Sequence, residues 1–285
     1  MRSNVLDYSL IAPPTLTAAL QTLAQDTTLT PIAGGTELMV ALSAGRLAQK
    51  NLLSINHLRE LRFIDTIPDA ITIGAGATFT DIRRHAVLAA DFPLLVQAAS
   101  WTGSIANQNR GTLGGNIVNA SPAADSPPAL LAYDATLSLI SARGSRTMPY
   151  RDFHLGYKRT ALAPGELLFS IRIERRFSAH VSYTRKVGTR NAQAISKVAL
   201  ACLALVSDGR IIQDIRIGAA SLRETPTRCS AAEQALLNQP ITPATIAAAR
   251  AALASEARPI DDIRSTAKYR AAVAANLLEE FLNTL

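Results

Sequence analysis

The sequence has few of the residues that hold metal clusters or disulfide frameworks. Among 285 residues there are two cysteines, Cys202 and Cys229, which are far apart and show no C-x-x-C spacing. Two such cysteines can neither build a disulfide framework nor hold an iron–sulfur cluster without another chain. The four histidines are also scattered, with no H-E-x-x-H grouping. We therefore expect no metal site in this chain.

Long apolar runs and a secretion signal are also lacking. No uninterrupted apolar stretch approaches the roughly 20 residues that a membrane helix needs. The first eight residues contain no apolar core followed by a small-residue cleavage site. Hydrophobic residues make up 48% of the chain and charged residues 18%, as in ordinary globular proteins. These features predict a cytoplasmic protein of one large domain or two ordinary ones, without contact to the membrane.

Aromatic residues are too few for a nucleic-acid surface, although the chain is basic. The formal net charge is +7, but the sequence contains only seven Phe, six Tyr and one Trp, and its arginines are spread out. Nucleic-acid binding normally combines clustered basic residues with aromatic stacking. The excess positive charge favours a surface that docks a partner or receives an anionic ligand.

The densest group of ligand-binding residue types lies between Asn109 and Asp125. It reads Asn-Arg-Gly-Thr-Leu-Gly-Gly-Asn-Ile-Val-Asn-Ala-Ser-Pro-Ala-Ala-Asp. Its three glycines permit turns with positive φ and allow a ligand to approach the backbone. The short polar side chains can donate and accept hydrogen bonds around a polyhydroxylated ligand. This composition predicts a backbone cradle for a phosphate-bearing cofactor, with a Gly/Asn-rich surface loop as the alternative.

A second anion-binding candidate begins at residue 29. A short strand over 29–33 is followed by Gly34-Gly35 and by a helix with Thr36 as the expected N-cap. Such a turn presents free N–H groups and the positive end of a helix dipole, although a plain tight turn would have the same sequence. The Gly74-x-Gly76 pair lacks the third glycine of a dinucleotide-binding motif, and we reject that fold.

Periodicity along the chain predicts an α+β protein with a smaller second part. In the first part, helices at 15–24 and 91–100 alternate with strands at 29–33, 52–55, 137–140 and 167–173, and a stretch alternating from residue 70 enters a helix near Thr80. In the second part, strands at 181–186, 197–206 and 211–217 form an antiparallel meander. Three helices follow, starting at Ser230 with a capping box, at Pro243 and at Ser265.

Several motifs resemble a known family when they are taken in order. They are Ala33-Gly-Gly-Thr-Glu-Leu, Gly74-Ala-Gly-Ala-Thr-Phe-Thr-Asp-Ile, Arg110-Gly-Thr-Leu-Gly-Gly-Asn, Asn119-Ala-Ser-Pro-Ala-Ala-Asp, Lys186-Val-Gly-Thr-Arg and Asp262-Ile-Arg-Ser-Thr-Ala-Lys-Tyr-Arg270. Together they resemble the FAD-binding (medium) subunit of the xanthine dehydrogenase and carbon monoxide dehydrogenase family of molybdenum hydroxylases. Each motif alone is weak, but their order and spacing over nearly the whole chain are specific.

The resemblance implies a vanillyl-alcohol-oxidase-like (PCMH-type) FAD-binding domain at 1–176, made of two subdomains. It also implies a C-terminal flavoprotein domain at 177–285, with a three-stranded antiparallel sheet and helices, which closes over the flavin. The first pyrophosphate loop would comprise Ile32, Ala33, Gly34, Gly35, Thr36 and Glu37. The second loop would comprise Gly111, Thr112, Gly115 and Asn116.

Five further positions match residues at the flavin end of the family's site. Asn119 matches a flavin contact, Asp125 the acid that binds the ribityl chain, and Leu168 a residue that packs on the flavin. Lys186 matches a lysine near the isoalloxazine ring, where a cation stabilises the negative charge of the reduced cofactor. A helix N-cap at Asp125 and a solvated strand end at Lys186 stay open as alternatives.

The chain departs from the family at the fifth position, Thr102, where some members stack an aromatic side chain on the flavin. Only the neighbouring Trp101 could replace that aromatic here. The family's usual Gln-Ile/Val-Arg segment is also absent, and Ala106, Asn107 and Gln108 occupy its place. The cysteine-bearing insertion of the benzoyl-CoA reductase branch is missing too. These departures concern the shape of the flavin face and hence its oxidant.

The implied activity is electron transfer in a heteromeric oxidoreductase. A large subunit with the molybdenum cofactor would oxidise the substrate, and a small subunit would carry electrons over two [2Fe-2S] clusters to FAD in this chain. NAD⁺ or another acceptor would then be reduced, and the assembly would be a dimer of heterotrimers. No catalytic acid, base or nucleophile is expected here. A stand-alone flavin oxidase and a scaffold without FAD are the two alternatives.

Overall fold

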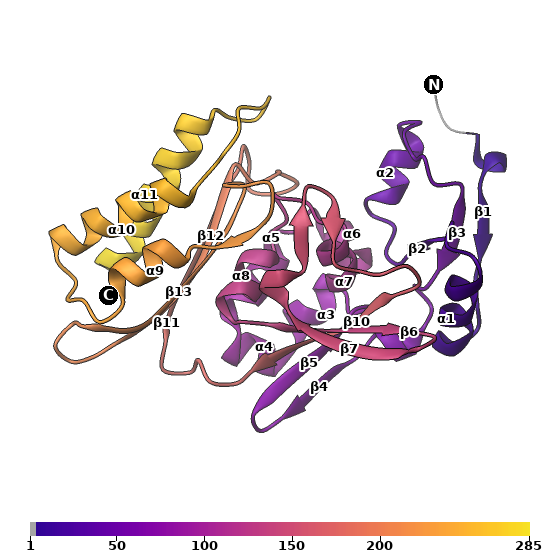
Figure 1. Cartoon of the computed structure of the whole chain (residues 1–285), viewed down its shortest axis with the longest axis horizontal. Helices are drawn as coiled ribbons and strands as arrows, with labels where there is room; N and C mark the ends of the chain where they lie inside the picture. Colours follow the sequence, from indigo (N-terminus) through magenta and orange to yellow (C-terminus); the bar gives the residue numbers. More distant parts are fainter. Residues whose placement is uncertain (1–3) are drawn as a thin grey trace.

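A three-stranded parallel sheet occupies the N-terminal end of the computed structural model, which describes residues 4–285 (Figure 1). Its strands lie in the order β1 (Ser9–Ile11), β3 (Asn51–Ser54) and β2 (Thr30–Ile32). Helix α1 (Leu16–Gln25) starts at its N-cap Thr15 and buries Leu20 and Leu23, while the short helix α2 (Leu38–Ser43) buries no residue. The 3₁₀ turns η1 (Val5–Asp7) and η2 (Arg59–Leu61) complete this lobe.

A five-stranded antiparallel sheet forms the centre of the molecule. Its order is β4 (Ile64–Ile67), β5 (Ala70–Gly74), β10 (Leu167–Glu174), β6 (Thr136–Ser141) and β7 (Gly144–Pro149). The helices that belong to it are α3 (Phe79–Arg84), α4 (Ala86–Asp91), α5 (Pro93–Trp101), α6 (Ile105–Arg110), α7 (Leu113–Val118) and α8 (Pro127–Ala132). Between β7 and β10 lie the 3₁₀ turn η3 (Tyr150–Asp152) and the small hairpin of β8 (His154–Gly156) and β9 (Arg159–Thr160). Sheet and helices share the largest apolar core.

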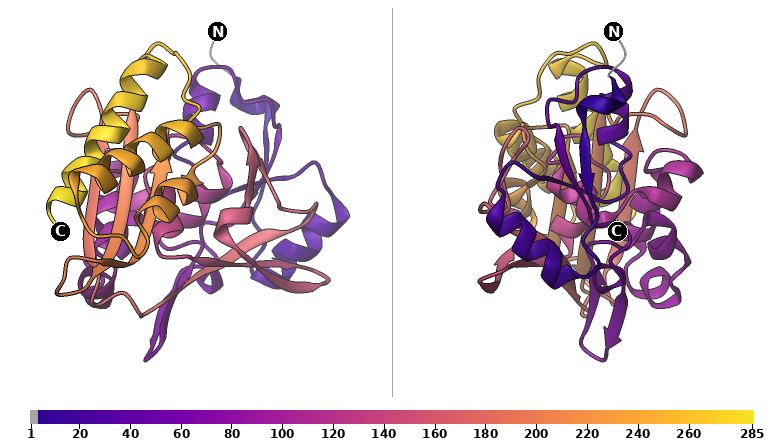
Figure 2. Two further views of the ribbon diagram at one scale, coloured as in Figure 1. Left: turned by 60° about the vertical axis from the view of Figure 1, so that its left-hand side comes forward. Right: turned by 90° about the vertical axis from the view of Figure 1, so that its right-hand side faces the viewer.

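A second antiparallel sheet, with helices on one face, forms the C-terminal part (Figure 2). The three expected strands are β11 (Val181–Val187), β12 (Val198–Val206) and β13 (Ile212–Ala220), and a two-residue strand, β14 (Thr227–Arg228), extends the edge. The helices are α9 (Ser230–Leu236), α10 (Pro243–Glu256) and α11 (Ala267–Asn283).

Strand β12 joins the two large cores because both of its faces are covered. Leu200 and Cys202 point to the core under α9–α11, whereas Ala201 and Leu203 point to the core of the central sheet. This alternation follows from the two-residue period of a strand, and it explains why β12 is apolar along its whole length. On neighbouring β13, Gly218 packs so tightly on α8 that an added Cβ would lie 2.1 Å from the Pro128 carbonyl oxygen.

Ion pairs reinforce the contact between the two parts. Asp134, two residues after the end of α8, pairs with Arg216 on β13 and with Arg228 on β14. The expected division of the chain at residue 176 lies in the connection between β10 and β11, and it stays a prediction.

Most expected elements are present, but several boundaries were wrong. Helix α2 begins at Leu38 after Glu37, which makes no side-chain cap, so Thr36 is not the N-cap. Helix α9 is preceded by Cys229, and Ser230 forms no capping box because Glu233 accepts hydrogen bonds from Arg228 and from the Ile217 amide instead. The helix expected over 91–100 is interrupted at Phe92, and the exposed strand β7 was not predicted.

Candidate functional site

The two predicted pyrophosphate loops are in direct contact, although about 75 residues separate them in the sequence. At Gly34 an added Cβ would lie 1.9 Å from the carbonyl oxygen of Arg110 and 3.0 Å from Cα of Gly111. A Cβ at Gly111 would in turn lie 3.5 Å from the Thr36 hydroxyl oxygen. Only glycine allows the first loop to approach the second so closely.

The second loop is helical, which corrects the expectation of glycine turns. Helix α6 ends at Arg110 and α7 begins at Leu113, and Gly111, Gly114 and Gly115 all lack positive φ. Close packing requires one of these glycines, since a Cβ at Gly114 would lie 2.6 Å from that of Ala75. The alternative of a surface loop is wrong as well, because this segment packs against the central sheet.

The first loop offers unused hydrogen-bond donors beside this contact. The amides of Gly34, Gly35, Thr36 and Glu37 donate to no acceptor within residues 4–285. Gly35 has φ +73°, a conformation that suits glycine. Across the contact, Gly115 is exposed and its amide is held by the Thr112 hydroxyl at 3.0 Å. Free amides next to side-chain-free backbone fit a pyrophosphate group.

A buried ion pair joins Asp125 to Lys186. The Lys186 ammonium lies 2.7 Å from Asp125 Oδ2, and the two side chains are only 8% and 11% exposed respectively. Lys186 also donates to the Trp101 carbonyl at 3.1 Å. Asp125 belongs to the α7–α8 connection, whereas Lys186 lies on β11, so the pair spans the two large parts of the molecule.

This geometry decides both open alternatives. Asp125 is not a helix N-cap, because Ser126 occupies that position before α8 and makes no side-chain cap. Lys186 is not a solvated strand end, because its ammonium is buried and paired. Ser196, which sequence analysis did not identify, donates to the other carboxylate oxygen of Asp125 at 2.7 Å.

Burial has an electrostatic consequence at Asp125. Loss of solvent raises the pKa of its carboxyl group, and the Lys186 ammonium and the Ser196 hydroxyl offset part of this rise. Both hydrogen bonds come from this chain, so the chain itself holds the carboxylate in one orientation. Its remaining lone pairs can accept hydrogen bonds from sugar hydroxyls.

Lys158 connects two other predicted site residues and was missed by sequence analysis. Its ammonium lies 2.6 Å from Asn119 Oδ1 and 3.3 Å from Glu37 Oε1. Both Lys158 and Ala120, which follows Asn119, adopt positive φ (+55° and +46°), and the Lys158 amide donates to the Ala120 carbonyl. Such backbone strain concentrates at functional sites. The sequence holds no local signal for this contact, because Lys158 and Glu37 are 121 residues apart.

Other predicted residues lie around these contacts. Asn116 accepts from the Ser126 hydroxyl at 2.6 Å, and Ile32 ends β2 with Ala33 directly after it. Leu168 is buried on β10 within the central core. Thr102 caps the end of α5, and its hydroxyl donates to the Ala98 carbonyl of its own helix.

The segment Ala106-Asn107-Gln108, which departs from the family pattern, lies on α6. Ala106 is exposed, Asn107 forms a capping box with Ser104, and Gln108 is buried. The Gln108 amide accepts from Arg83 at 2.6 Å and donates to the Ser100 carbonyl at 2.9 Å. Asn107 and Gln108 therefore stabilise the start of α6 and its packing on α3 and α5.

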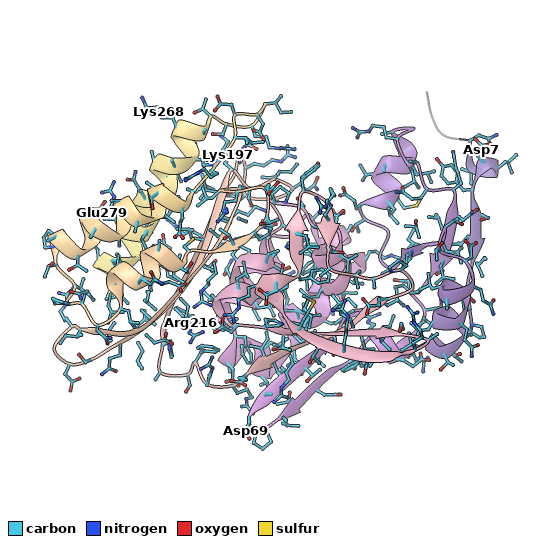
Figure 3. All side chains as sticks on the ribbon, viewed as in Figure 1. Asp7, Asp69, Lys197, Arg216, Lys268 and Glu279 are labelled. Atoms are coloured by element: carbon cyan, nitrogen blue, oxygen red, sulfur yellow. The ribbon has the colours of Figure 1, made fainter. Side chains whose placement is uncertain are left out.

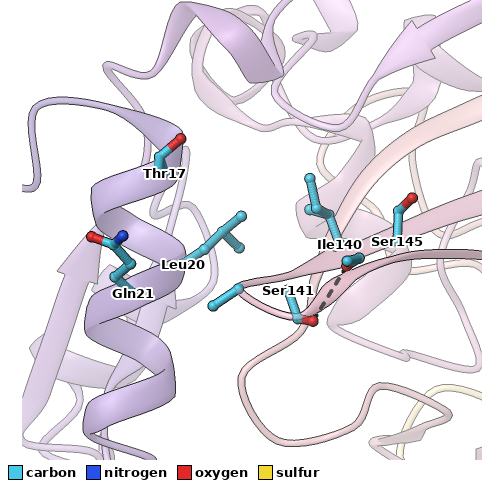
Figure 4. A pocket seen from close by; sticks show the side chains of 8 residues that line it. Thr17, Leu20, Gln21, Ile140, Ser141 and Ser145 are labelled. Carbon is cyan, nitrogen blue, oxygen red and sulfur yellow. Dashed lines mark hydrogen bonds between the residues drawn. The ribbon is translucent and has the colours of Figure 1, made fainter.

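Two cavities of the chain lie away from these residues. One of about 330 Å³ lies between α1 and the β6–β7 hairpin, lined by Thr17, Leu20 and Ser145 among others (Figure 4). Another of about 200 Å³ lies beside Asp134 and Tyr150. Neither contains a predicted site residue. In the described part of the chain no His, Cys, Asp and Glu side chains gather into a metal site, and no helix is long and apolar enough to cross a bilayer.

Comparison with known proteins identifies the family. Residues 6–174 match the family described as FAD binding domain in molybdopterin dehydrogenase, and residues 183–285 match the CO dehydrogenase flavoprotein C-terminal domain. The glyceraldehyde dehydrogenase medium chain of Sulfolobus acidocaldarius is 30% identical over 93% of both chains. The xanthine dehydrogenase FAD-binding subunit of Escherichia coli O157:H7 is 30% identical over 90% of this chain and 88% of its own.

The fold agrees with these sequence matches. A chain of carbon monoxide dehydrogenase from Hydrogenophaga pseudoflava superimposes with a TM-score of 0.93 at 28% identity, covering 99% of this chain and 98% of that one. The predicted family, the two-part α+β fold, the FAD cofactor and the oxidoreductase class are thereby confirmed. The chain belongs to the FAD-binding subunits of the molybdenum hydroxylases related to xanthine dehydrogenase and carbon monoxide dehydrogenase.

Proposed function

We propose that FAD lies along the line of contacts from the Gly34–Glu37 loop to the Asp125–Lys186 pair. The observation that carries this proposal is the buried ion pair, because a side chain from the α7–α8 connection and one from β11 bind each other at the predicted flavin end. Burying a carboxylate and an ammonium costs desolvation free energy, which their attraction offsets only when the geometry is good. Such a pair is therefore more often kept for a function than for stability. FAD would give both groups a role. Its ribityl hydroxyls can donate to the Asp125 carboxylate, and its ring gains negative charge on reduction, which the Lys186 ammonium would stabilise.

The phosphate end would be bound mainly by backbone. The free amides of residues 34–37 donate to the pyrophosphate, and exposed Gly115 lets it approach α7. Thr112 and Asn116 fix that part of α7, and Ile32 and Ala33 bring the chain to the loop. Lys158 neutralises Glu37, which would otherwise repel a pyrophosphate.

The flavin end would be bound mainly by side chains. Asp125 accepts hydrogen bonds from the ribityl hydroxyls, with Asn119 closer to the middle of the cofactor. Lys186 places its charge near the ring and favours the reduced form, and Thr102 and Leu168 form part of the surroundings. When bound, FAD supplies the exchange of electrons, and the residues of this chain set its position and potential.

In the wider assembly this chain would deliver electrons to a final acceptor. Electrons would come from the [2Fe-2S] clusters of a small subunit, which receives them from a molybdopterin-binding large subunit, and NAD⁺ or another acceptor would take them up. The names medium chain and FAD-binding subunit of the relatives support an assembly of several chains. We propose a dimer of heterotrimers, a cytoplasmic location, and a division at residue 176 between two domains.

A tagged full-length chain tests this function directly. Purification from its natural host should yield a yellow protein with flavin absorption bands, together with two further chains that contain molybdenum and iron in a ratio of one to four. A chain that shows no flavin bands even after addition of FAD would contradict the proposal. A flavin-containing chain that oxidises a substrate without any partner would instead support a stand-alone oxidase.

A further inference from the structure

Arg270 is a buried arginine outside the residues assigned above. It lies in the first turn of α11 and is only 4% exposed. One guanidinium nitrogen donates to the Lys197 carbonyl at 3.0 Å and another to Asp262 Oδ1 at 2.7 Å. Its Nε has no acceptor within residues 4–285. Figure 3 shows Lys197 next to the start of α11, where Lys268 is labelled.

Asp262 fixes the approach of this arginine. Its Oδ1 also accepts from the backbone amides of Arg264 and Ser265, at 2.8 and 3.1 Å. Although partial desolvation opposes the shift, the Arg264 amide and the Arg270 and Arg264 guanidinium groups lower the pKa of Asp262 to about 2. Asp262 therefore keeps its charge over the whole physiological pH range and orients Arg270 toward β12.

The Ser196–Lys197 segment, to which Arg270 donates, also forms hydrogen bonds with two other parts of the chain. The Lys197 amide donates to the Val187 carbonyl at 2.8 Å, and the Ser221 hydroxyl donates to the Ser196 carbonyl at 2.9 Å. Ser196 is fully buried, and its hydroxyl is the one that holds Asp125. Hydrogen bonds from Asp262 through Arg270 to the Lys197 carbonyl, the backbone between Lys197 and Ser196, and the Ser196 hydroxyl thus connect Asp262 to the carboxylate at the flavin end.

Anchoring α11 would not require such an arrangement. The helix already buries Leu278, Phe281 and Leu282 in the C-terminal core, and its N-terminus is capped by Thr266. Burying a guanidinium with one unpaired N–H costs free energy that an apolar side chain would avoid. Within residues 4–285, the acceptors that Arg270 binds are Asp262 and the Lys197 carbonyl.

We propose that Asp262 and Arg270 are positioning residues, which hold the Ser196–Lys197 segment so that Ser196 orients the Asp125 carboxylate toward FAD. This inference rests on the proposed FAD site. The C-terminal Asp262–Arg270 motif would then contribute to cofactor binding, although it lies on the opposite side of β12 from Asp125.

Cofactor affinity of the full chain tests the path. Ser196→Ala removes the hydroxyl and should weaken FAD binding about tenfold, since hydrogen bonds to charged groups are among the stronger ones. Arg270→Gln should weaken it about fivefold, and Asp262→Asn should act in the same direction. The matched control is Arg250→Gln, which breaks the Arg250–Glu279 pair between α10 and α11 far from Ser196 and should change affinity less than twofold.

A double variant separates positioning from general stability. If Arg270 acts through Ser196, Arg270→Gln in the Ser196→Ala background should weaken FAD binding less than twofold further, and both single variants should shift the flavin absorption bands alike. The inference would be overturned if the losses of FAD affinity in the two single variants multiplied in the double variant. It would also be overturned if Arg270→Gln lowered the melting temperature but left affinity and spectrum unchanged. Should Arg270→Gln not fold, Arg270→Lys replaces it in the same cycle.

The controls also distinguish this inference from the site itself. If Ser196→Ala weakens FAD binding and Arg270→Gln does not, only the role of Arg270 is wrong. If Ser196→Ala and Lys186→Met both leave affinity and spectrum unchanged, the placement of the flavin end is wrong.

Discussion

The two ends of the candidate FAD site differ in how the chain builds them. At the phosphate end, residues 34–37 offer free backbone donors, and the exposed Gly115 leaves space beside α7. At the flavin end, Asp125 and Lys186 offer opposite charges that are almost fully buried. The first end should therefore respond to added volume, and the second to changes of charge and pH.

The largest effect is expected where volume is added between the loops. Gly34→Ala places a Cβ against the Arg110 carbonyl, which would force the loops apart, destabilise the chain by about 3 kcal/mol and abolish FAD binding. Thermal unfolding and FAD titration measure the two effects. A stable variant with normal flavin content would show that the loop contact does not form.

Gly115→Leu separates the cofactor from the fold. Because Gly115 is exposed, with only the Thr112 hydroxyl within 3 Å of an added Cβ, the chain should remain folded while the side chain occupies the place of the pyrophosphate. We expect at least a hundredfold loss of affinity for FAD. Normal flavin content in a folded variant would place the pyrophosphate elsewhere.

Acidification should affect the flavin end next. Burial raises the pKa of Asp125, so its carboxylate should become protonated at a higher pH than the ordinary aspartate value of about 4. Protonation removes the charge that pairs with Lys186, and FAD affinity should fall as the pH drops through that pKa. Asp125→Asn should bind FAD weakly at all pH values and lack this step. A step of equal size in Asp125→Asn would assign the titration to another group.

The smallest effect is expected at Lys158, whose side chain is 38% exposed. Lys158→Met removes the link between Glu37 and Asn119, and solvent screening limits the loss of affinity to about two- to fivefold. The loss should grow at low salt, where Glu37 repels the pyrophosphate more strongly. Lys268→Met, on the exposed side of α11, is the control and should have no effect. Equal behaviour of both variants would remove Lys158 from the site.

The sequence predicted those parts of the fold that depend on local patterns. Apolar periodicity identified α1, β12 and α11, because each has a long face that must be buried. The Thr36 cap and the glycine turns were wrong because packing decided them: the Gly34 and Gly114 contacts require small residues inside closely packed, partly helical segments. Strand β7 is polar and exposed, and it has no apolar period to detect.

The same limit explains which site residues were missed. Motif resemblance pointed to Asp125 and Lys186, and the structure brings them together. Ser196 and Lys158 belong to no recognised cofactor motif, and they reach the site only through contacts that span 71 and 39 residues. Such contacts depend on how β11, β12 and the β8–β9 hairpin pack, which no local pattern encodes.

The central claim is that Lys186 lies at the flavin ring and that Lys158, which links Glu37 to Asn119, lies farther from the ring. A redox titration of the FAD-loaded chain tests it with two matched variants. Lys186→Met should lower the midpoint potential of the flavin by several tens of millivolts while FAD remains bound, because a nearby positive charge favours the reduced form. Lys158→Met should leave the potential unchanged. An unchanged potential in Lys186→Met, or an equal shift in both variants, would contradict the account.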